Sequence, residues 1–146
     1  MPFIYIIAPL TAVIIAQISK FLIPRNHLKP TIKNLLAYSG MPSSHAAVTI
    51  SLMTIIGLIQ GIESPLFALA TLMTFLALRD AMGIRQYIGK QGKVINELVE
   101  DLNEDRYLDD RYPQLIEKVG HTPMQIIAGA MIGFFVAIAC FITLYN

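Results

Sequence analysis

The sequence predicts an all-α fold: a polytopic membrane helical bundle with four transmembrane helices plus a short amphipathic helix in the second long connection. Of the 146 residues, 55% are hydrophobic and only 14% are charged, whereas soluble domains carry about 25% charged residues. The apolar residues gather in four long runs, and the chain length fits a single membrane domain over residues 1–146. These observations together exclude an ordinary soluble domain.

The four apolar runs set the expected transmembrane helices. We place these helices at about residues 2–23, 44–62, 65–84 and 123–145. About 20 apolar residues are needed to cross the hydrocarbon core, so the first and last runs fit easily and the middle two are short. The turn residues Gly57, Gly61 and Pro65 predict a tight connection between the middle two helices.

The basic residues fall on one side of the expected membrane bundle. Four lie at the end of the first run and after it: Lys20, Arg25, Lys29 and Lys33. Seven lie between the third and fourth runs: Arg79, Arg85, Lys90, Lys93, Arg106, Arg111 and Lys118. The positive-inside rule then places both long connections in the cytoplasm, the second over residues 85–121, and both termini outside. We therefore expect an integral multi-pass protein of a cell inner membrane.

The second connection contains the expected amphipathic helix. Its apolar face consists of Val94, Ile95, Leu98, Val99 and Leu102. The opposite face is acidic, which disfavours binding to anionic lipid, so the helix is expected to cap the bundle or to offer a partner surface. Asp109 and Asp110 fit a solvated acidic face better than a metal site, and no cofactor is expected.

Small residues recur at helix-contact spacing and bear on assembly. Ala8, Ala12 and Ala16 form one series, and Gly57-x-x-x-Gly61 and Gly129-x-x-x-Gly133 form two more. Such residues let helix backbones approach closely in lipid, within the chain or between subunits. A homodimer is therefore left open, with membrane lipids as the other surroundings. A net charge of +1 and the lack of a basic tail indicate no nucleic-acid partner.

Two short polar motifs, each with a histidine, stand directly before apolar runs. Ser39-Gly40-Met41-Pro42-Ser43-Ser44-His45 precedes the second run, and Gly120-His121-Thr122-Pro123 precedes the fourth. A helix start offers unpaired backbone N–H groups and the positive end of the helix dipole, which suit a phosphate. The pair of motifs therefore favours phosphoryl chemistry over a passive membrane role.

Four helix ends share one membrane face in this topology, so their polar residues can converge. These residues are Gln17, Lys20, Ser43, Ser44, His45, Arg79, Asp80, Arg85, His121, Thr122 and Gln125. Each has an ordinary structural interpretation, such as helix capping for Ser43 and Thr122 or a mutual ion pair for Arg79 and Asp80. Together they match phosphoryl transfer, in which cations clamp the anionic group and one histidine attacks while another protonates the leaving oxygen.

At these motifs the chain resembles the phosphatidic acid phosphatase type 2 (PAP2) superfamily, and more closely its divergent small branch related to acid phosphatases and vanadium-dependent haloperoxidases. The resemblance lies in three stretches and their order: Pro42 to Ala46, Arg79 to Arg85 with Gly89-Lys90-Gln91, and Gly120 to Gly133. It covers nearly the whole chain. It implies a membrane helical fold and phosphatase chemistry at the histidines.

The resemblance also implies distinct roles. His121 matches the family's nucleophile and His45 the residue that protonates the leaving group. The family's Ser-Arg pair would fall on Gln114 and Leu115, and its orienting Asp on Gln125, so this chain departs from the pattern there. We expect Lys20, Arg79 and Arg85 to supply the cations and Asp80 the orienting carboxylate. Ser43, Ser44 and Gln125 complete the expected substrate-binding set.

The predicted function is that of a membrane-embedded lipid phosphate phosphatase. It would hydrolyse a phosphomonoester or pyrophosphate through a phospho-histidine intermediate, without a metal. The alternative is a non-catalytic membrane protein of the same fold that binds phosphorylated lipid or acts as a scaffold. A small transporter is a weaker alternative, because four short spans with a polar end do not resemble a continuous pore.

Overall fold

A computed structural model describes residues 3–26, 40–104, 112–117 and 119–145. These residues form helices and contain no strand, which confirms the predicted all-α class. The elements are α1 (Ile4–Leu22), the 3₁₀ turn η1 (Pro24–Asn26), α3 (Ser44–Gln60), α4 (Pro65–Met82), α5 (Ile84–Glu104) and α6 (Pro123–Leu144). The acidic pair at 109–110 lies outside the described residues.

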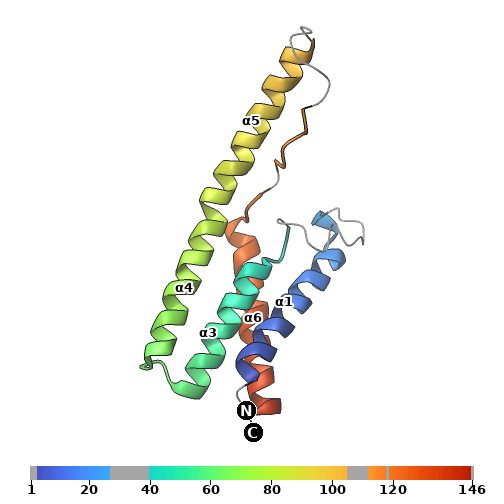
Figure 1. Cartoon of the computed structure of the whole chain (residues 1–146). Helices are drawn as coiled ribbons and strands as arrows, with labels where there is room; N and C mark the ends of the chain where they lie inside the picture. The colour runs from blue at the N-terminus through green and yellow to red at the C-terminus, as the bar shows by residue number, and fades with distance from the viewer. Residues whose placement is uncertain (1–2, 27–39, 105–111, 118, 146) are drawn as a thin grey trace.

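Helix α3 is the central helix of the bundle. It packs against α1, α4 and α6, and α1 also packs against α6 (Figure 1). Helix α1 begins and α6 ends at one end of the bundle, where both termini lie. At the opposite end α1 ends, α3 begins, α4 ends and α6 begins, so the four helix ends meet as the sequence predicts.

The small residues pack helices within the chain. Ala8, Ala12 and Ala16 are fully buried along α1. A Cβ at Gly129 would overlap the backbone oxygen of Ser43, and a Cβ at Gly133 would overlap that of Ala47. The backbone of α6 therefore lies directly against the start of α3, and these two small-residue series serve intrachain contacts.

The other glycine pair does not pack helix against helix. Gly61 follows α3 as its C-cap with a φ of 85°, a left-handed conformation that glycine adopts without steric cost. Gly57 lies against the ring of Phe67 in α4. Gly61 therefore begins the predicted tight turn, whereas Gly57 lies within α3. The turn ends where Ser64 caps α4 by accepting a hydrogen bond from the Phe67 N–H.

The length and apolar composition of its helices make the chain an integral membrane protein. Among the described residues, three helical stretches are long and apolar enough to cross a membrane: α1, the stretch Pro65–Leu102, and α6. Helix α3 is apolar but has 17 residues, or about 26 Å at 1.5 Å per residue, just short of the roughly 30 Å core. The number of four crossings therefore stays a prediction for α3.

The predicted short amphipathic helix is part of a longer one. Helix α5 begins at Ile84, directly after Gly83 ends α4, and α4 and α5 run nearly in line as one rod that extends beyond the bundle (Figure 1). The expectation that this helix caps the bundle is therefore wrong. The physical reason is local: the Gly83 carbonyl accepts hydrogen bonds from the Gln86 and Tyr87 N–H groups, so a new helix starts without a loop.

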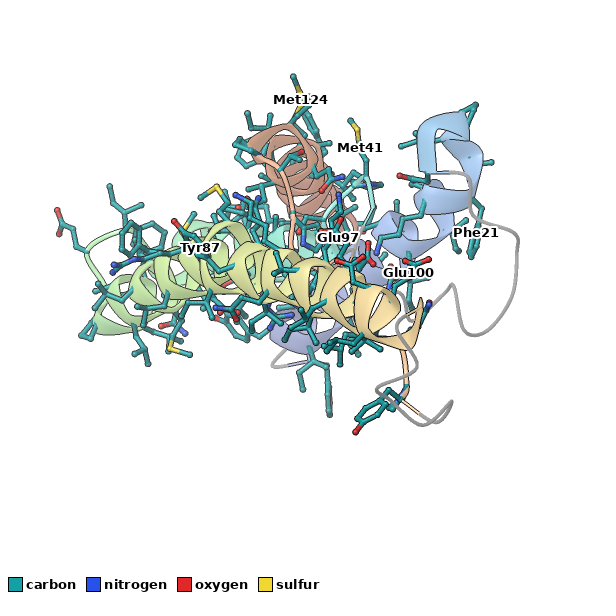
Figure 2. The ribbon with its side chains drawn as sticks, turned by 90° about the horizontal axis from the view of Figure 1, so that it is seen from above. Phe21, Met41, Tyr87, Glu97, Glu100 and Met124 are labelled. Carbon is teal, nitrogen blue, oxygen red and sulfur yellow. The ribbon has the colours of Figure 1, made fainter. Side chains whose placement is uncertain are left out.

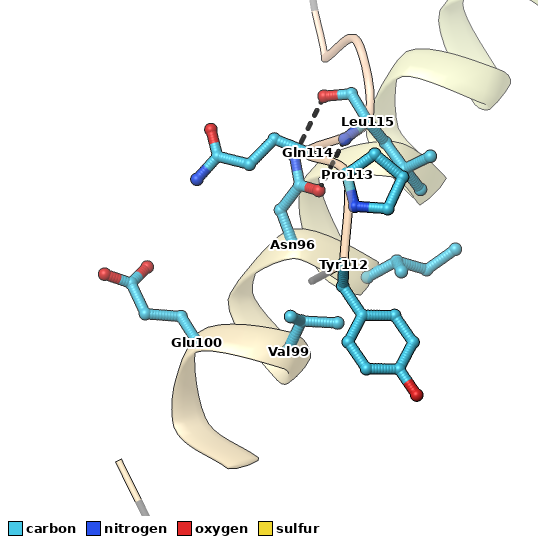
Figure 3. Close-up of a pocket in the computed structure, with 8 residues that line it drawn as sticks. Asn96, Val99, Glu100, Tyr112, Pro113, Gln114 and Leu115 are labelled. Carbon is cyan, nitrogen blue, oxygen red and sulfur yellow. Dashed lines mark hydrogen bonds between the residues drawn. The ribbon is translucent and has the colours of Figure 1, made fainter. Parts of the chain in front are cut away.

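An extended segment, residues 112–117, lies along α5 and leads toward His121. The amide of Asn96 holds it with three hydrogen bonds. It donates to the Leu115 carbonyl at 2.9 Å and to the Glu117 carboxylate at 3.0 Å, and it accepts from the Leu115 N–H at 2.9 Å (Figure 3). Gly89 and Gly92 lie under the segment, where a Cβ would press on the backbone oxygens of Glu117 and Ile116. The two glycines thus let the segment approach the backbone of α5 closely, and Asn96 holds it there by hydrogen bonds.

Candidate functional site

The two motif histidines meet at the shared end of the bundle. The ring centroids of His45 and His121 are 5.7 Å apart, and the rings cross at 77°. His121 is 1% exposed, and His45 is partly exposed. The convergence predicted from span counting is therefore present between residues 76 positions apart in the sequence.

His45 is positioned by the start of α3 and its contact with α6. Ser43 caps α3 and accepts a hydrogen bond from the Ala46 N–H at 3.3 Å. The Ser43 N–H donates to the Gln125 carbonyl in α6 at 2.9 Å. Met41 and Met124, which flank this contact, lie on the same side of the molecule in Figure 2. The P-S-S-H motif is thus fixed to α6 through its backbone.

Asn26 ties the same motif to α1. Its side-chain amide donates to the Lys20 carbonyl at 2.8 Å and to the Met41 carbonyl at 2.6 Å, and its oxygen accepts from the Met41 N–H at 2.9 Å. Sequence reasoning missed this residue, because an asparagine after a helix end is common and its partner Met41 lies 15 positions away. Asn26 connects the end of α1 to the loop that carries His45.

We expect the Asn26→Ala variant to lose about 1–3 kcal/mol of stability, because three partly buried backbone groups lose their partner. Thermal unfolding in detergent measures the loss. Asn26→Asp keeps the acceptor for the Met41 N–H, so its unfolding temperature should lie between those of wild type and Asn26→Ala. The control is Gln60→Ala, which removes one exposed hydrogen bond to the Tyr5 hydroxyl. Equal unfolding temperatures for Asn26→Ala and wild type would contradict this role.

His121 is positioned through its backbone by the α4–α5 junction. Its N–H donates to the Ala81 carbonyl at 3.0 Å, and its carbonyl accepts from the Gln86 amide at 2.6 Å. Gly120 has a φ of 89°, and a Cβ there would lie 2.9 Å from the Gln86 backbone nitrogen. Gln86 is thus a second positioning residue that the sequence did not reveal, since nothing in its local pattern marks it.

Gln125 does not have the role that the sequence suggested for it. Its side-chain oxygen accepts from the Thr122 N–H at 2.9 Å, and the Thr122 hydroxyl accepts from the Gln125 N–H, so the two form a capping box. The side-chain amide oxygen of Gln125 is therefore committed to the start of α6. The orienting partner expected for His121 at this position is absent among the described contacts.

The cations expected at the site are only partly brought together. Lys20 is 1% exposed in the last turn of α1, and its charge and that of Arg85 both act on His121. Arg85 pairs with Asp80, with 2.6 Å between Nε and Oδ2. Asp80 therefore positions Arg85 and makes no hydrogen bond to either histidine among the described contacts. Arg79 is exposed on α4 and is not among the charges acting on His121.

The imidazole of His121 is buried without a hydrogen-bond partner. Neither of its ring nitrogens, nor Nδ1 of His45, has a partner among the described residues. Burial is the main cause that lowers the pKa of His121 from 6.5 to about 4. The nearby charges of His45, Lys20 and Arg85 lower it further. His121 is therefore neutral at physiological pH, the form in which an imidazole is a nucleophile.

This lowered pKa predicts how stability depends on pH. Between about pH 6.5 and pH 4 the unfolded chain protonates His121 and the folded chain does not, so stability falls as the pH falls, by up to about 3 kcal/mol. The unfolding temperature of wild type should therefore fall relative to that of His121→Asn, which lacks this titrating group, as the pH is lowered from about 6.5 to 4. Parallel curves across this range would contradict a neutral, buried His121.

The described residues hold no group of three His, Cys, Asp or Glu side chains that could bind a metal ion. The site brings together the imidazoles of His45 and His121 at the starts of α3 and α6, the buried ammonium of Lys20 and the guanidinium of Arg85. Such a set can hold an anion and exchange a group or a proton with it.

Fold and site together define a helical integral membrane protein with a histidine pair at one end of its bundle. The chain belongs to the divergent PAP2 family, which matches residues 4–136. It is similar to the "Uncharacterized membrane protein YuiD" of Bacillus subtilis (strain 168), with 32% identity over 143 residues, 88% of this chain and 87% of the relative. No solved structure matches the chain. The family resemblance inferred from the motifs is therefore confirmed.

Proposed function

We propose that this protein is a membrane-embedded phosphatase of lipid phosphates, with His121 as nucleophile and His45 as general acid. A ring nitrogen of His121 attacks phosphorus, the P–O bond to the lipid breaks, and the leaving oxygen takes a proton from His45. Water then attacks the phospho-histidine and gives a proton to His45, and inorganic phosphate leaves. Apart from the substrate and water, the steps use only side chains of this chain.

The observation that carries the proposal is the histidine pair itself. Two imidazoles stand 5.7 Å apart between ring centroids, with three buried nitrogens that have no partner among the described residues. Orphaned buried polar groups are costly and usually serve a function. A phosphoryl group between the rings would engage nitrogens of both histidines, one as nucleophile and the other as proton donor.

Cations and helix starts support anion binding there. Lys20 and Arg85 are the charges that would neutralise the phosphate oxygens, and Asp80 would hold Arg85 in place. The first N–H groups of α3, at Ser44 and His45, add donors at the positive end of the helix dipole. The negative charge of a bound phosphate would also stabilise an imidazolium at His45. Arg79 and Gln125 have weaker support as ligands, because of their exposure and capping role.

A lipid substrate is favoured because the site lies at the end of apolar helices. We place four crossings in the membrane, with α3 as the short one, and the site on the cytoplasmic face of an inner membrane, since the basic connections flank it. A phosphate head beside the helix ends would then leave its hydrocarbon chain in the bilayer. The single membrane domain would cover residues 1–146.

Phosphate release from vesicles tests the proposal. The purified protein should release inorganic phosphate, in the presence of EDTA, from at least one member of a panel of diacyl and polyprenyl phosphates and pyrophosphates. Inorganic vanadate should inhibit the release, since it mimics the five-coordinate phosphorus of the transition state. A lack of release across the whole panel would contradict the proposal.

The second candidate is a non-catalytic binder of phosphorylated lipid or a scaffold. Two observations favour it: His121 is 1% exposed, and the position of the family's orienting carboxylate is taken by a capping glutamine. Saturable binding of lipid phosphate without turnover, lost in a Lys20→Gln variant, would assign this function instead.

A further inference from the structure

Helix α5 carries a stripe of exposed apolar side chains that no described part of the chain covers. Ile84 is 65% exposed, Ile88 50%, Ile95 47% and Leu98 56%. The docked segment 112–117 lies on Gly89 and Gly92, to one side of the stripe. Exposed apolar patches of this kind mark interaction sites.

The stripe has the spacing of a coiled coil. Its residues, which we name the seam, are Ile84, Ile88, Gln91, Ile95, Leu98 and Leu102. The intervals alternate 4, 3, 4, 3, 4, as in the a and d positions of a heptad. Ile88, Ile95 and Leu102 then fall at a positions, and Ile84, Gln91 and Leu98 at d positions. The seam thus extends along nearly the whole of α5.

The lipid bilayer does not reach this stripe if α4 crosses it. Helix α4 has 18 residues, or about 27 Å, slightly less than the roughly 30 Å hydrocarbon core. Arg79 and Asp80 lie in its last turn and Arg85 follows it, and α5 continues in line beyond them (Figure 1). The seam would therefore stand in water unless another protein surface covers it.

We propose that the seam binds the seam of a second copy of this chain as a parallel two-helix coiled coil. Two copies inserted in the same orientation present their α5 helices in parallel, so one twofold axis along the membrane normal brings identical residues together. Ile88 and Ile95 at a positions with Leu98 at a d position fit the pattern of two-stranded pairs, and Gln91 is the one polar residue of the seam.

The exposed apolar area of the seam and the charges beside it fit a second copy of this chain. Four apolar residues of the seam and the neighbouring Tyr87 and Val94 are 47% to 66% exposed. They offer on the order of 600 Å² per copy, comparable with the roughly 800 Å² per partner of a standard interface. The charged residues Lys90, Lys93, Glu97 and Glu100 lie off the seam, so like charges do not meet in a symmetric pair.

The membrane helices do not supply the contact between the two copies. The small residues of α1 and α6, which could have formed a dimer contact, are used inside the chain. Ile95 of the seam also lines a pocket of about 600 Å³ with Tyr112 and Leu115 from the docked segment (Figure 3). The apolar surface thus continues from the seam onto that segment.

Cysteine cross-linking in native membranes tests the proposal. In a Cys140→Ser background, Ile88→Cys and Ile95→Cys should form disulfide-linked dimers under mild oxidation about tenfold faster than Lys93→Cys and Glu97→Cys, because only facing Cβ atoms come within disulfide reach. Equal rates at the seam and control positions would overturn the proposal, as would protection of the seam cysteines by the bilayer from a water-soluble maleimide.

A second variant separates pairing from folding. Ile95→Asp with Leu98→Asp should turn a detergent-solubilised dimer into a monomer by size-exclusion chromatography with light scattering, while the unfolding temperature of the bundle stays within a few degrees. The matched control, Lys93→Asp, should remain dimeric. A wild-type monomer, or a dimer that survives both seam charges, would contradict a coiled coil at α5.

Discussion

Replacing His121 with asparagine is expected to lower kcat for lipid phosphates by at least about a thousandfold, because the side chain that accepts the phosphoryl group is removed. Asparagine keeps a polar side chain of similar size, and the hydrogen bonds of His121 to Ala81 and Gln86 involve only the backbone. The fold should therefore survive. Initial rates on the same vesicles, with the unfolding temperature as a control, measure the effect.

His45 provides the matched comparison. His45→Asn should slow hydrolysis of an alkyl phosphate by about 10²–10⁴-fold, the usual contribution of a general acid. It should slow p-nitrophenyl phosphate much less, because nitrophenolate leaves without a proton. His121→Asn should be equally inactive on both substrates. The same leaving-group pattern in both variants would contradict the separate roles assigned to the two histidines.

The largest expected effect on stability comes from Gly129→Ala. A single Cβ there would overlap the backbone oxygen of Ser43, and neither helix backbone can shift cheaply, since the Ser43 N–H is bonded to Gln125. We expect a loss of about 3 kcal/mol, the upper range for overpacking. Because Ser43 begins the helix that carries His45, the remaining folded protein should also have a lower kcat.

Gly57→Ala is the control for this prediction. It is the same substitution inside a helix, but its Cβ would meet the ring of Phe67 at 3.0 Å, a side chain that can turn aside. The better helix propensity of alanine offsets part of the contact, so stability should change little. If Gly129→Ala unfolds at the same temperature as Gly57→Ala, the close contact of α6 with the P-S-S-H loop is not as described.

The sequence predicted the meeting of His45 and His121 because helix ends alternate between two faces of a membrane bundle. It could not predict Asn26 and Gln86, whose partners are backbone groups of other elements, brought near only by the folded bundle. It also missed the length of α5, which begins at Ile84, because the amphipathic helix was predicted only from its apolar face at residues 94–102.

The capping box at Thr122 shows a different limit of prediction from sequence. Its pattern was visible in the sequence as an N-cap, but Gln125 was also a candidate in place of the family's carboxylate. Only the structure shows that its oxygen bonds the Thr122 N–H. Local hydrogen bonds at a helix start compete with a role in a site, and spacing alone does not show which one prevails.

Trapping the intermediate tests the central claim most directly. Wild-type protein mixed with a lipid phosphate and quenched in alkali should carry an acid-labile, base-stable phosphoryl group, and peptide mass spectrometry should place it on His121. His45→Asn, which retains the nucleophile but lacks the base for the water step, should accumulate more of it from an activated phosphate. A phosphoryl group on another residue, or turnover without one at His121, would contradict the mechanism.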